Sequence, residues 1–267
     1  MLLKLITLLL LFSSSLFAQV NPAARFSGMG NTGTALGGAA ALTSNPAGIT
    51  CLEKPQAGLY YQEHILNTDI RTKGGLLALP TKYGVFGTHL SSYGITGAYG
   101  DLKLGMTYAR LFGRDFSTSL TLNYHQLRID KYGGSEAYSV DLGVQYFITE
   151  CWLVGAHWAN LGRTAYDRRA NTTIPTHLRF GSSYNVHKNL LVTADIEQIR
   201  STKGIDARSG LEYKPIAWLC FRGGVSMRDL KRFGGFGVFY NNLLLDMATV
   251  IHPRLGLSPQ MFLAYAF

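Results

Sequence analysis

The side chains that could carry out catalysis or bind a metal are spread along the whole chain. The seven histidines show no metal-ligand spacing and are His64, His89, His125, His157, His177, His187 and His252. His125 or His177 could sit on a strand beside a serine, as in a membrane-embedded hydrolase, but the sequence defines no set of serine, histidine and acid. We therefore expect a protein that is not an enzyme and that binds no metal.

Three glycines near the N-terminus have the spacing of the dinucleotide-binding fingerprint. They are Gly28, Gly30 and Gly33, and Glu53 follows about twenty residues later. That fingerprint binds a pyrophosphate only when a strand precedes it within a βαβ unit. The residues before Gly28 are instead the polar beginning of an exported chain, so we expect no cofactor.

Alternation of polar and apolar residues dominates the chain from Gln56 onward. Leu120 and Leu122 fall on one face of their segment and Thr121 and Asn123 on the other, which is the two-residue period of a β-strand. Only 15% of the residues are charged and 47% are apolar, which argues against a disordered chain. Such segments between turn residues predict about fourteen strands, near residues 56–64, 71–79, 83–91, 100–111, 115–129, 136–147, 151–160, 175–186, 189–198, 204–213, 216–226, 233–240, 243–250 and 258–267.

The connections between these segments alternate in length. The tight ones lie at residues 80–82, 113–114, 149–150, 187–188, 214–215 and 241–242, and those between them are longer, as at residues 160–174. Outer-membrane barrels have short periplasmic turns, longer external loops and an even number of strands. The last segment also ends in an aromatic residue, Phe267, as the final strand of such a barrel does. We predict an all-β, transmembrane antiparallel barrel of about 14 strands in the outer membrane of a Gram-negative bacterium, with both termini periplasmic.

If the apolar faces contact lipid, the charged residues of the opposite faces line the barrel. These residues are Lys103, Asp141, Arg179, Asp195, Glu197, Arg208, Glu212, Arg222 and Asp246. They could form a polar ladder that guides a solute or grips an inner segment. Alternatively, they pair with one another, because an isolated charge in a narrow lumen costs free energy, and the pairing closes the lumen without any ligand. Mixed signs favour pairing over selection for one kind of ion.

The expected external loops carry an excess of basic residues. This external basic rim consists of Arg163, Arg168, Arg169, Arg228, Lys231 and Arg232, in a chain of formal net charge +9. Such a rim would attract phosphate-bearing lipids of the outer leaflet or an acidic partner protein, unless the loops are simply solvated. Nucleic acid is not expected as a partner, because there is no basic groove with regularly spaced aromatic residues.

The N-terminal residues have the features of a secretory signal peptide over residues 1–18. A basic start is followed by an apolar run from Leu5 to Phe12 and by small residues up to Ala18. For an exported chain, the three cysteines at positions 51, 151 and 220 form either one disulfide plus a free thiol or three buried free thiols.

Residues 19–54 differ from the rest of the chain, because they are rich in glycine and alanine and poor in charge. Small residues can pack closely inside a narrow lumen, where large side chains would clash. We interpret this segment as a plug inside a barrel formed by residues 55–267. Its motif residues are Gly28, Gly30, Asn45, Pro46 and Ala47.

Two stretches of the plug, residues 24–35 and residues 39–49, resemble the N-terminus of the PorV/PorQ family. That family belongs with the FadL-like outer-membrane transporters, whose N-terminal region carries a motif like Asn45, Pro46 and Ala47. The resemblance implies a fourteen-stranded barrel with an N-terminal plug. It also implies one of two roles: an accessory of type IX protein secretion, with a machinery protein or exported cargo as partner, or a channel for hydrophobic small molecules. Of these we expect an accessory or scaffold, surrounded by outer-membrane lipid.

Overall fold

The computed structural model describes residues 22–66, 68–167, 172–200, 204–228 and 230–267. The signal peptide expected over residues 1–18 lies outside the described residues. In the described part of the chain, fourteen strands form one closed barrel. They are β1 (Gln56–Glu63), β2 (Ile70–Thr81), β3 (Gly84–Ile95), β4 (Tyr99–Phe112), β5 (Phe116–Ile129), β6 (Gly133–Thr149), β7 (Trp152–Ala159), β10 (His177–His187), β11 (Leu190–Ile199), β12 (Ile205–Ile216), β13 (Leu219–Ser226), β14 (Lys231–Tyr240), β15 (Leu243–His252) and β16 (Gly256–Ala266).

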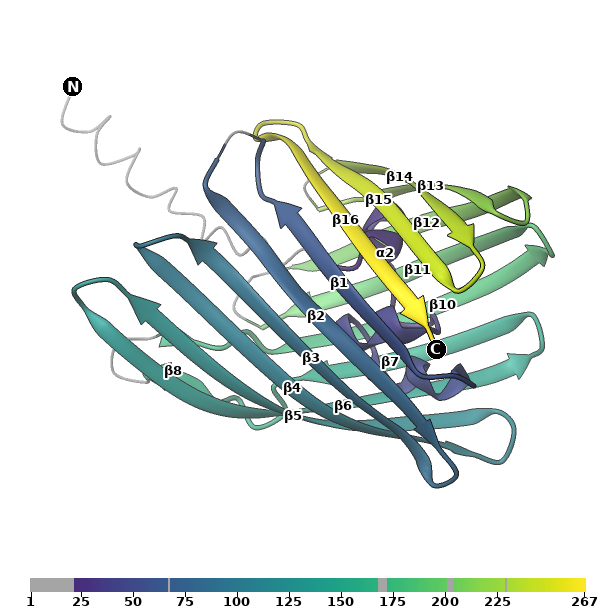
Figure 1. The fold of residues 1–267 in the computed structure, drawn as a ribbon, viewed down its shortest axis with the longest axis horizontal. Coiled ribbons are helices and arrows are strands. Elements are labelled where there is room, and N and C mark those ends of the chain that lie inside the picture. The colour runs from purple at the N-terminus through teal and green to yellow at the C-terminus, as the bar shows by residue number, and fades with distance from the viewer. Residues whose placement is uncertain (1–21, 67, 168–171, 201–203, 229) are drawn as a thin grey trace.

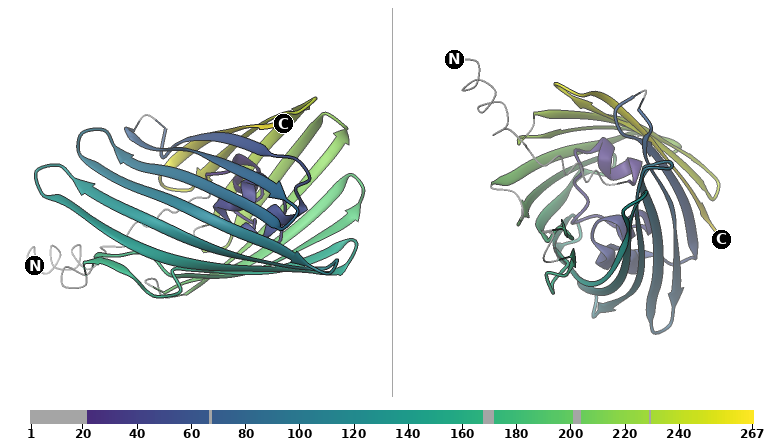
Figure 2. Two further views of the ribbon diagram at one scale, coloured as in Figure 1. Left: turned by 60° about the horizontal axis from the view of Figure 1, so that its bottom comes forward. Right: turned by 90° about the vertical axis from the view of Figure 1, so that its left-hand side faces the viewer.

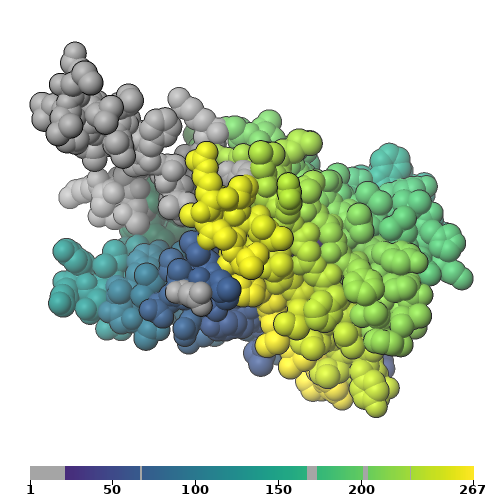
Figure 3. Space-filling view, turned by 90° about the horizontal axis from the view of Figure 1, so that it is seen from above, coloured from purple at the N-terminus to yellow at the C-terminus, as the bar shows by residue number. Residues whose placement is uncertain are grey.

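The barrel closes because its first and last strands pair. Gln56 on β1 faces Ala266 on β16, and the antiparallel register continues to Gln62 and Gln260. Figure 1 shows the two strands side by side, and Figure 3 shows the yellow C-terminal strand packed against the blue N-terminal ones on the outer surface. Each remaining strand of the barrel pairs antiparallel with the barrel strands before and after it along the chain, as predicted, and β7 pairs with β10.

One element was not predicted. The connection between β7 and β10 contains a separate two-stranded hairpin of β8 (Ala165–Asp167) and β9 (Thr172–Thr173), where we expected a loop. Strands of two or three residues are too short to show an alternating pattern, so this hairpin could not be predicted from sequence periodicity.

Side chains alternate between the outer and the inner face of the wall. On β5, Leu120 and Leu122 are 47% and 60% exposed on the outside, whereas Thr121 and Asn123 are 1% and 2% exposed on the inside. The wall is therefore apolar outside and polar inside, which is the reverse of a barrel built for water and suits a bilayer.

Three short helices of the described chain lie inside the barrel: α2 (Ala24–Gly28), η1 (Ala39–Thr43) and η2 (Pro46–Cys51) (Figure 2). Phe26, Met29 and Ile49 are fully buried and pack in one apolar cluster with residues of the inner wall. Small residues let the backbone approach the wall: Gly30 has a φ of +77°, and a Cβ there would lie 2.7 Å from the carbonyl oxygen of Ser209. In the described part of the chain, no helix has the length and apolarity needed to cross a bilayer.

The two ends of the barrel differ in their connections. At one end, strands such as β4 and β5 are joined by tight turns, and the amide of Phe267 donates to the carbonyl of Pro55 at 2.9 Å, so both ends of the barrel sequence lie there. At the other end the connections are longer, and residues 160–176 join β7 to β10. We call these the tight-turn end and the long-loop end.

The cysteines settle one alternative that the sequence left open. All three are free thiols: Cys51 at the end of η2, Cys151 in the turn between β6 and β7, and Cys220 on β13. Only Cys220 is buried, so the expectation of three buried thiols is wrong for Cys51 and Cys151, which are exposed. The barrel is held together by strand pairing and packing, without a disulfide among these three residues.

Candidate functional site

Asn45 joins the plug to the barrel wall. Its Oδ1 accepts a hydrogen bond from the amide of Ala47 at 3.3 Å and so caps η2. Its Nδ2 donates to the carbonyls of Thr34 at 2.7 Å and of Val144, on β6, at 3.0 Å. Pro46 follows at the first helical position, where the missing N–H costs no hydrogen bond. The Asn-Pro-Ala motif therefore determines both where η2 begins and where it attaches to the wall.

Glu212 on β12 holds the first plug helix through Arg25. Arg25 donates to both carboxylate oxygens of Glu212, at 3.0 and 3.1 Å. Arg222 on β13 donates to Glu212 at 2.7 Å and to Asp246 at 2.6 Å. Burial opposes the charge on Arg25, but the attraction of Glu212 outweighs it and raises the pKa of Arg25. Two positive and two negative groups thus balance one another, as buried charges must.

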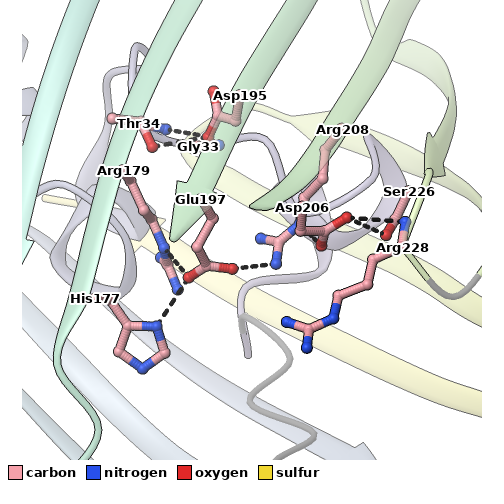
Figure 4. Close-up of polar contacts among 10 residues, drawn as sticks. All are labelled: Gly33, Thr34, His177, Arg179, Asp195, Glu197, Asp206, Arg208, Ser226 and Arg228. Atoms are coloured by element: carbon pink, nitrogen blue, oxygen red, sulfur yellow. Dashed lines mark hydrogen bonds and ion pairs between the residues drawn. The ribbon is translucent and has the colours of Figure 1, made fainter. Parts of the chain in front are cut away.

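Asp195 on β11 is a third anchor for the plug. Its Oδ2 accepts hydrogen bonds from the amides of Gly33 and Thr34, both at 3.1 Å, and from the Thr34 hydroxyl at 2.7 Å (Figure 4). Adjacent backbone N–H groups form a small anion-binding concavity, and here the wall supplies the anion. The plug is therefore tied to the wall at β6, β11 and β12.

Glu197 gathers three basic side chains nearer the long-loop end. Arg179 donates to it at 2.5 Å, His177 Nδ1 lies 2.9 Å from it, and Arg208 also bonds to it (Figure 4). Arg208 donates in addition to Asp206 at 2.6 Å. These contacts neutralise the inner wall over β10–β12 and leave no surface of a single sign there.

Between the plug and the long-loop end lies a cavity of about 610 Å³, a typical size for a small-molecule site. Leu42, Ser44 and Pro46 of the plug line one side of it. Aromatic and imidazole rings dominate the wall, from Tyr60, Tyr93, Tyr99, Tyr166, His64, His89, His125, His157 and His177. Two acidic and two basic residues also line it, namely Asp101, Asp141, Lys103 and Arg179. The cavity is therefore rich in rings and hydrogen-bonding groups and balanced in charge.

Several imidazole nitrogens of this cavity are not used by the protein. Among the described residues, His89 Nδ1, both ring nitrogens of His157 and His177 Nε2 have no hydrogen-bond partner. These three residues are at most 6% exposed. A buried polar group without a partner costs about 1–3 kcal/mol, so a water or ligand group that bonded to it would be stabilised there.

Tyr166 of β8 covers part of the outer end of the cavity. Its hydroxyl donates to Asp101, on β4, at 3.0 Å, and its carbonyl accepts from the Ser135 hydroxyl at 3.0 Å. Burial, followed by the charge of Asp101, raises the pKa of the Tyr166 phenol above its ordinary value. At the base of the same connection, Asn160 has a φ of +52° and donates its amide to Asp141 at 2.8 Å. The β8–β9 hairpin is thereby attached to side chains of the lumen.

Solved structures share this architecture. The toluene transporter TodX of Pseudomonas putida superposes with a TM-score of 0.69 over 90% of this chain and 96% of its own, at 13% identity. For CymD, a monoaromatic hydrocarbon channel, the TM-score is 0.70 over 92% and 97%, at 15% identity. For a FadL homologue of Pseudomonas aeruginosa it is 0.62 over 91% and 97%, at 12% identity. The fold is that of the FadL-like barrels.

Sequence comparison adds no family to this result. No family model matches the chain, and neither does any curated protein. The resemblance to PorV/PorQ proteins is therefore not confirmed, whereas the FadL-like fold that it implied is present.

In this FadL-like barrel, the nine charged residues expected in the lumen all face inward. Eight of them form ion pairs, and the ninth, Asp195, bonds to the plug. Lys103 and Asp141, for example, lie 3.6 Å apart at the cavity. Both alternatives posed by the sequence thus have a structural counterpart, since most charges pair with one another and Glu212 and Asp195 also hold the plug.

The predicted basic rim is divided into separate places. Arg163 lies between β7 and β8, and Arg228, Lys231 and Arg232 lie at the β13–β14 connection and the start of β14. Strands β10, β11 and β12 separate these two places around the barrel. Arg168 and Arg169 lie outside the described residues. The described rim residues therefore do not form one continuous surface.

The residues considered for catalysis and cofactor binding have the following surroundings in the structure. His125 Nε2 lies 2.9 Å from the Ser139 hydroxyl, but no carboxylate hydrogen-bonds to His125 in the described part of the chain, so the pair lacks the acid of a hydrolytic triad. His177 bonds to Glu197. Gly28 lies in α2, which no described strand precedes, so the nucleotide fingerprint lacks its βαβ unit. Among the described residues, no cluster could hold a metal ion.

Sequence reasoning missed the gathering of histidines in one cavity. Register explains it: His125 faces Lys103 across β4 and β5, and His157 faces Arg179 across β7 and β10. His177 also precedes Arg179 by two positions and so shares its face. The signal was present, because these histidines have the same strand parity as the charges predicted to line the lumen.

Proposed function

We propose that this chain is a channel of the outer membrane for small molecules that combine a ring or short apolar body with hydrogen-bonding groups. The observation that carries the proposal is the cavity of about 610 Å³ between the plug and the long-loop end, with its rings and unpartnered imidazole nitrogens. The apolar outer face of the closed barrel supports a position in a bilayer. The names of structures with the same fold, a toluene transporter and a monoaromatic hydrocarbon channel, support the same class of function by analogy.

The lining of the cavity favours polar over purely hydrocarbon ligands. Tyrosine and histidine rings offer faces against which a small ring can stack. A hydrocarbon, however, would leave the nitrogens of His89 and His157 buried without partners, and a site with unpaired polar groups rejects a ligand that cannot bond to them. We therefore propose substituted aromatic molecules, such as aromatic alcohols, as the ligand class.

Passage through the barrel requires a change at the plug. The plug is held by hydrogen bonds and ion pairs at Asn45, Asp195 and Glu212, all of which can be exchanged for other partners. We propose that it rearranges while a ligand passes. The accessory role in type IX secretion, which the PorV/PorQ resemblance implied, has no support in the comparisons, and no enzymatic activity is part of this proposal.

The proposal is tested by ligand binding to the purified protein in detergent. We expect calorimetry to detect benzyl alcohol, with toluene binding more weakly. Replacing His157 by Phe fills similar volume and removes both ring nitrogens, so the affinity for benzyl alcohol should fall about tenfold. His187→Phe is the matched control, because His187 is exposed at the tight-turn end of β10.

Cells that lack the chain should also take up labelled benzyl alcohol more slowly. Equal uptake in these cells, together with no binding of either compound, would contradict the channel.

A further inference from the structure

A groove of about 470 Å³ lies on the outer face of the wall near the long-loop end. Its lining includes Tyr61 on β1, Arg71 and Lys73 on β2, and Arg128 on β5. These three basic residues point outward, since the residues next to them, Thr72 and Leu127, are buried and line the lumenal cavity. None of the three belongs to the basic rim expected from the sequence.

Strand register explains the shape of this groove. Arg71 pairs with Gly94, Gly94 with Gly100, and Gly100 with Arg128, in one outward-facing row across β2–β5. Figure 1 shows these four strands side by side in the wall. The two glycines have no side chains, so the row is open between its two arginines. Three strand spacings separate the arginine backbones by about 14 Å, which is wide enough for a phosphorylated sugar.

The glycines differ in what they tolerate. Gly94 has a φ of +153°, and a Cβ there would lie 2.0 Å from the carbonyl oxygen of Tyr99, so the backbone requires glycine. An added Cβ at Gly100 would meet nothing within 4 Å. The open space above Gly100 is therefore not needed by the packing of the wall, and a side chain could be placed in it.

The basic residues of the groove are only partly neutralised by the protein. Lys73 and Arg128 form no ion pair among the described residues, whereas Arg71 lies 3.6 Å from the exposed Asp69 and pairs across β1 and β2 with the outward-facing Glu63. Asp130 is a single acidic residue in the lining beside three basic ones. A basic residue on the lipid face of a barrel costs up to about 4 kcal/mol at the bilayer midplane and little at its boundary. Cations here fit the boundary of the bilayer, next to anionic headgroups.

The wall below the groove is apolar. Leu90 on β3 pairs with Leu104 on β4, which pairs with Tyr124 on β5. The ring of Tyr124 contacts that of Tyr138 on β6, with their centroids 5.4 Å apart. Outward aromatic residues mark the edge of the hydrocarbon layer in such barrels. Basic groove and apolar wall thus follow each other in the order of the headgroup and acyl chains of a lipid.

We propose that this groove binds the phosphorylated sugar headgroup of an outer-leaflet glycolipid, with the acyl chains along the apolar wall. Arg71 and Arg128 are placed to bind phosphate oxygens in a bidentate manner from the two sides. Lys73, on the side of the groove nearer the apolar wall, adds a third positive charge. The inference rests on the membrane location proposed above, but it is independent of whether the lumen transports anything.

Native mass spectrometry of the full chain in detergent tests this inference, with bisphosphorylated lipid A and its dephosphorylated form as probes. We expect one molecule of the bisphosphorylated form to remain bound to the wild-type protein. The double variant Arg71→Gln, Arg128→Gln should bind it at least about tenfold more weakly. Gly100→Phe should weaken binding similarly, because the ring would fill the groove.

Two control variants separate the groove from general effects on the wall. Gly223 is an outward glycine on the far wall at which a Cβ would also meet open space, so Gly223→Phe should retain the lipid. Arg232→Gln removes an exposed cation of β14 and should also retain it. Unchanged binding in the double variant, equal binding of both lipid forms, or displacement by inorganic phosphate alone would overturn the proposal. Failure of benzyl alcohol binding would leave it standing.

Discussion

The hydroxyl of Tyr60 on β1 donates a hydrogen bond to the carbonyl oxygen of Leu90 on β3, at 2.8 Å, across the intervening strand β2. The side chain can cross because Gly74 lies beneath it: a Cβ at Gly74 would stand 2.0 Å from that carbonyl oxygen and 2.5 Å from the Tyr60 hydroxyl. Three neighbouring strands are thereby joined on the lumenal side, beside the proposed ligand cavity.

Replacing Gly74 by Ala should therefore destabilise the barrel. The methyl group must displace Tyr60 and strain the β2–β3 pairing, at a cost of about 1–3 kcal/mol. Urea unfolding in detergent, followed by tryptophan fluorescence, measures the change. Gly75→Ala is the control, since its Cβ would point outward and come no nearer than 3.1 Å to the flexible Leu59 side chain and 3.3 Å to the carbonyl oxygen of Gly58. Equal losses in the two variants would mean that the crossing hydrogen bond has no special role.

Removing the carboxylate of Asp195 should loosen the plug. The Asp195→Ala variant leaves the amides of Gly33 and Thr34 and the Thr34 hydroxyl without their acceptor. We expect a loss of about 2–4 kcal/mol in the free energy of unfolding, together with larger ionic currents through the barrel in planar bilayers. Asp115→Ala, in the exposed β4–β5 turn, should change neither. A variant current equal to that of the wild type would show that the plug stays in place without this anchor.

Glu212 should be the most costly charge to remove. The Glu212→Gln variant leaves the guanidinium groups of Arg25 and Arg222 with too little negative charge in a buried site. Breaking such a network costs about 3–5 kcal/mol, measurable as a lower urea midpoint. Adding Arg25→Gln should restore part of the loss, because it removes one of the uncompensated charges. If the second substitution instead added a further independent loss, the two residues would not be coupled.

The barrel was predictable from the sequence because its physical signals are local. Alternation such as that of Leu120 and Thr121 repeats every two residues, and tight turns bound the segments. The attachment of the plug was only partly predictable. Asn45 and Pro46 indicate the start of a helix within three residues, whereas the partners Arg25 and Glu212 are 187 positions apart.

The candidate sites depend on register across many strands, which no local pattern specifies. The lumenal histidines come from separate strands. They meet only because each lies on the lumenal face of its strand and the shift between neighbouring strands brings them to the same height in the barrel. The outer groove likewise arises from two glycines that pair between Arg71 and Arg128. In both cases each residue looks ordinary in its own segment, and the site appears only when neighbouring strands are aligned.

His64 should make the stability of the barrel depend on pH. It lies in the connection after β1, where its Nε2 is 2.7 Å from the Thr72 hydroxyl and its ring packs edge-on against Tyr93. Burial lowers the pKa of His64 from 6.5 to about 4. Because the unfolded chain binds a proton at higher pH than the folded one, His64 contributes its full stability above about pH 6.5 and loses it as the pH falls toward about 4. His64→Gln retains a hydrogen-bonding group without this titration, so the decline in the urea midpoint over that interval should be smaller than in the wild type.

His187→Gln, which alters an exposed histidine at the opposite end, should follow the wild-type profile. Parallel profiles for wild type and His64→Gln would show that His64 does not contribute to the pH dependence.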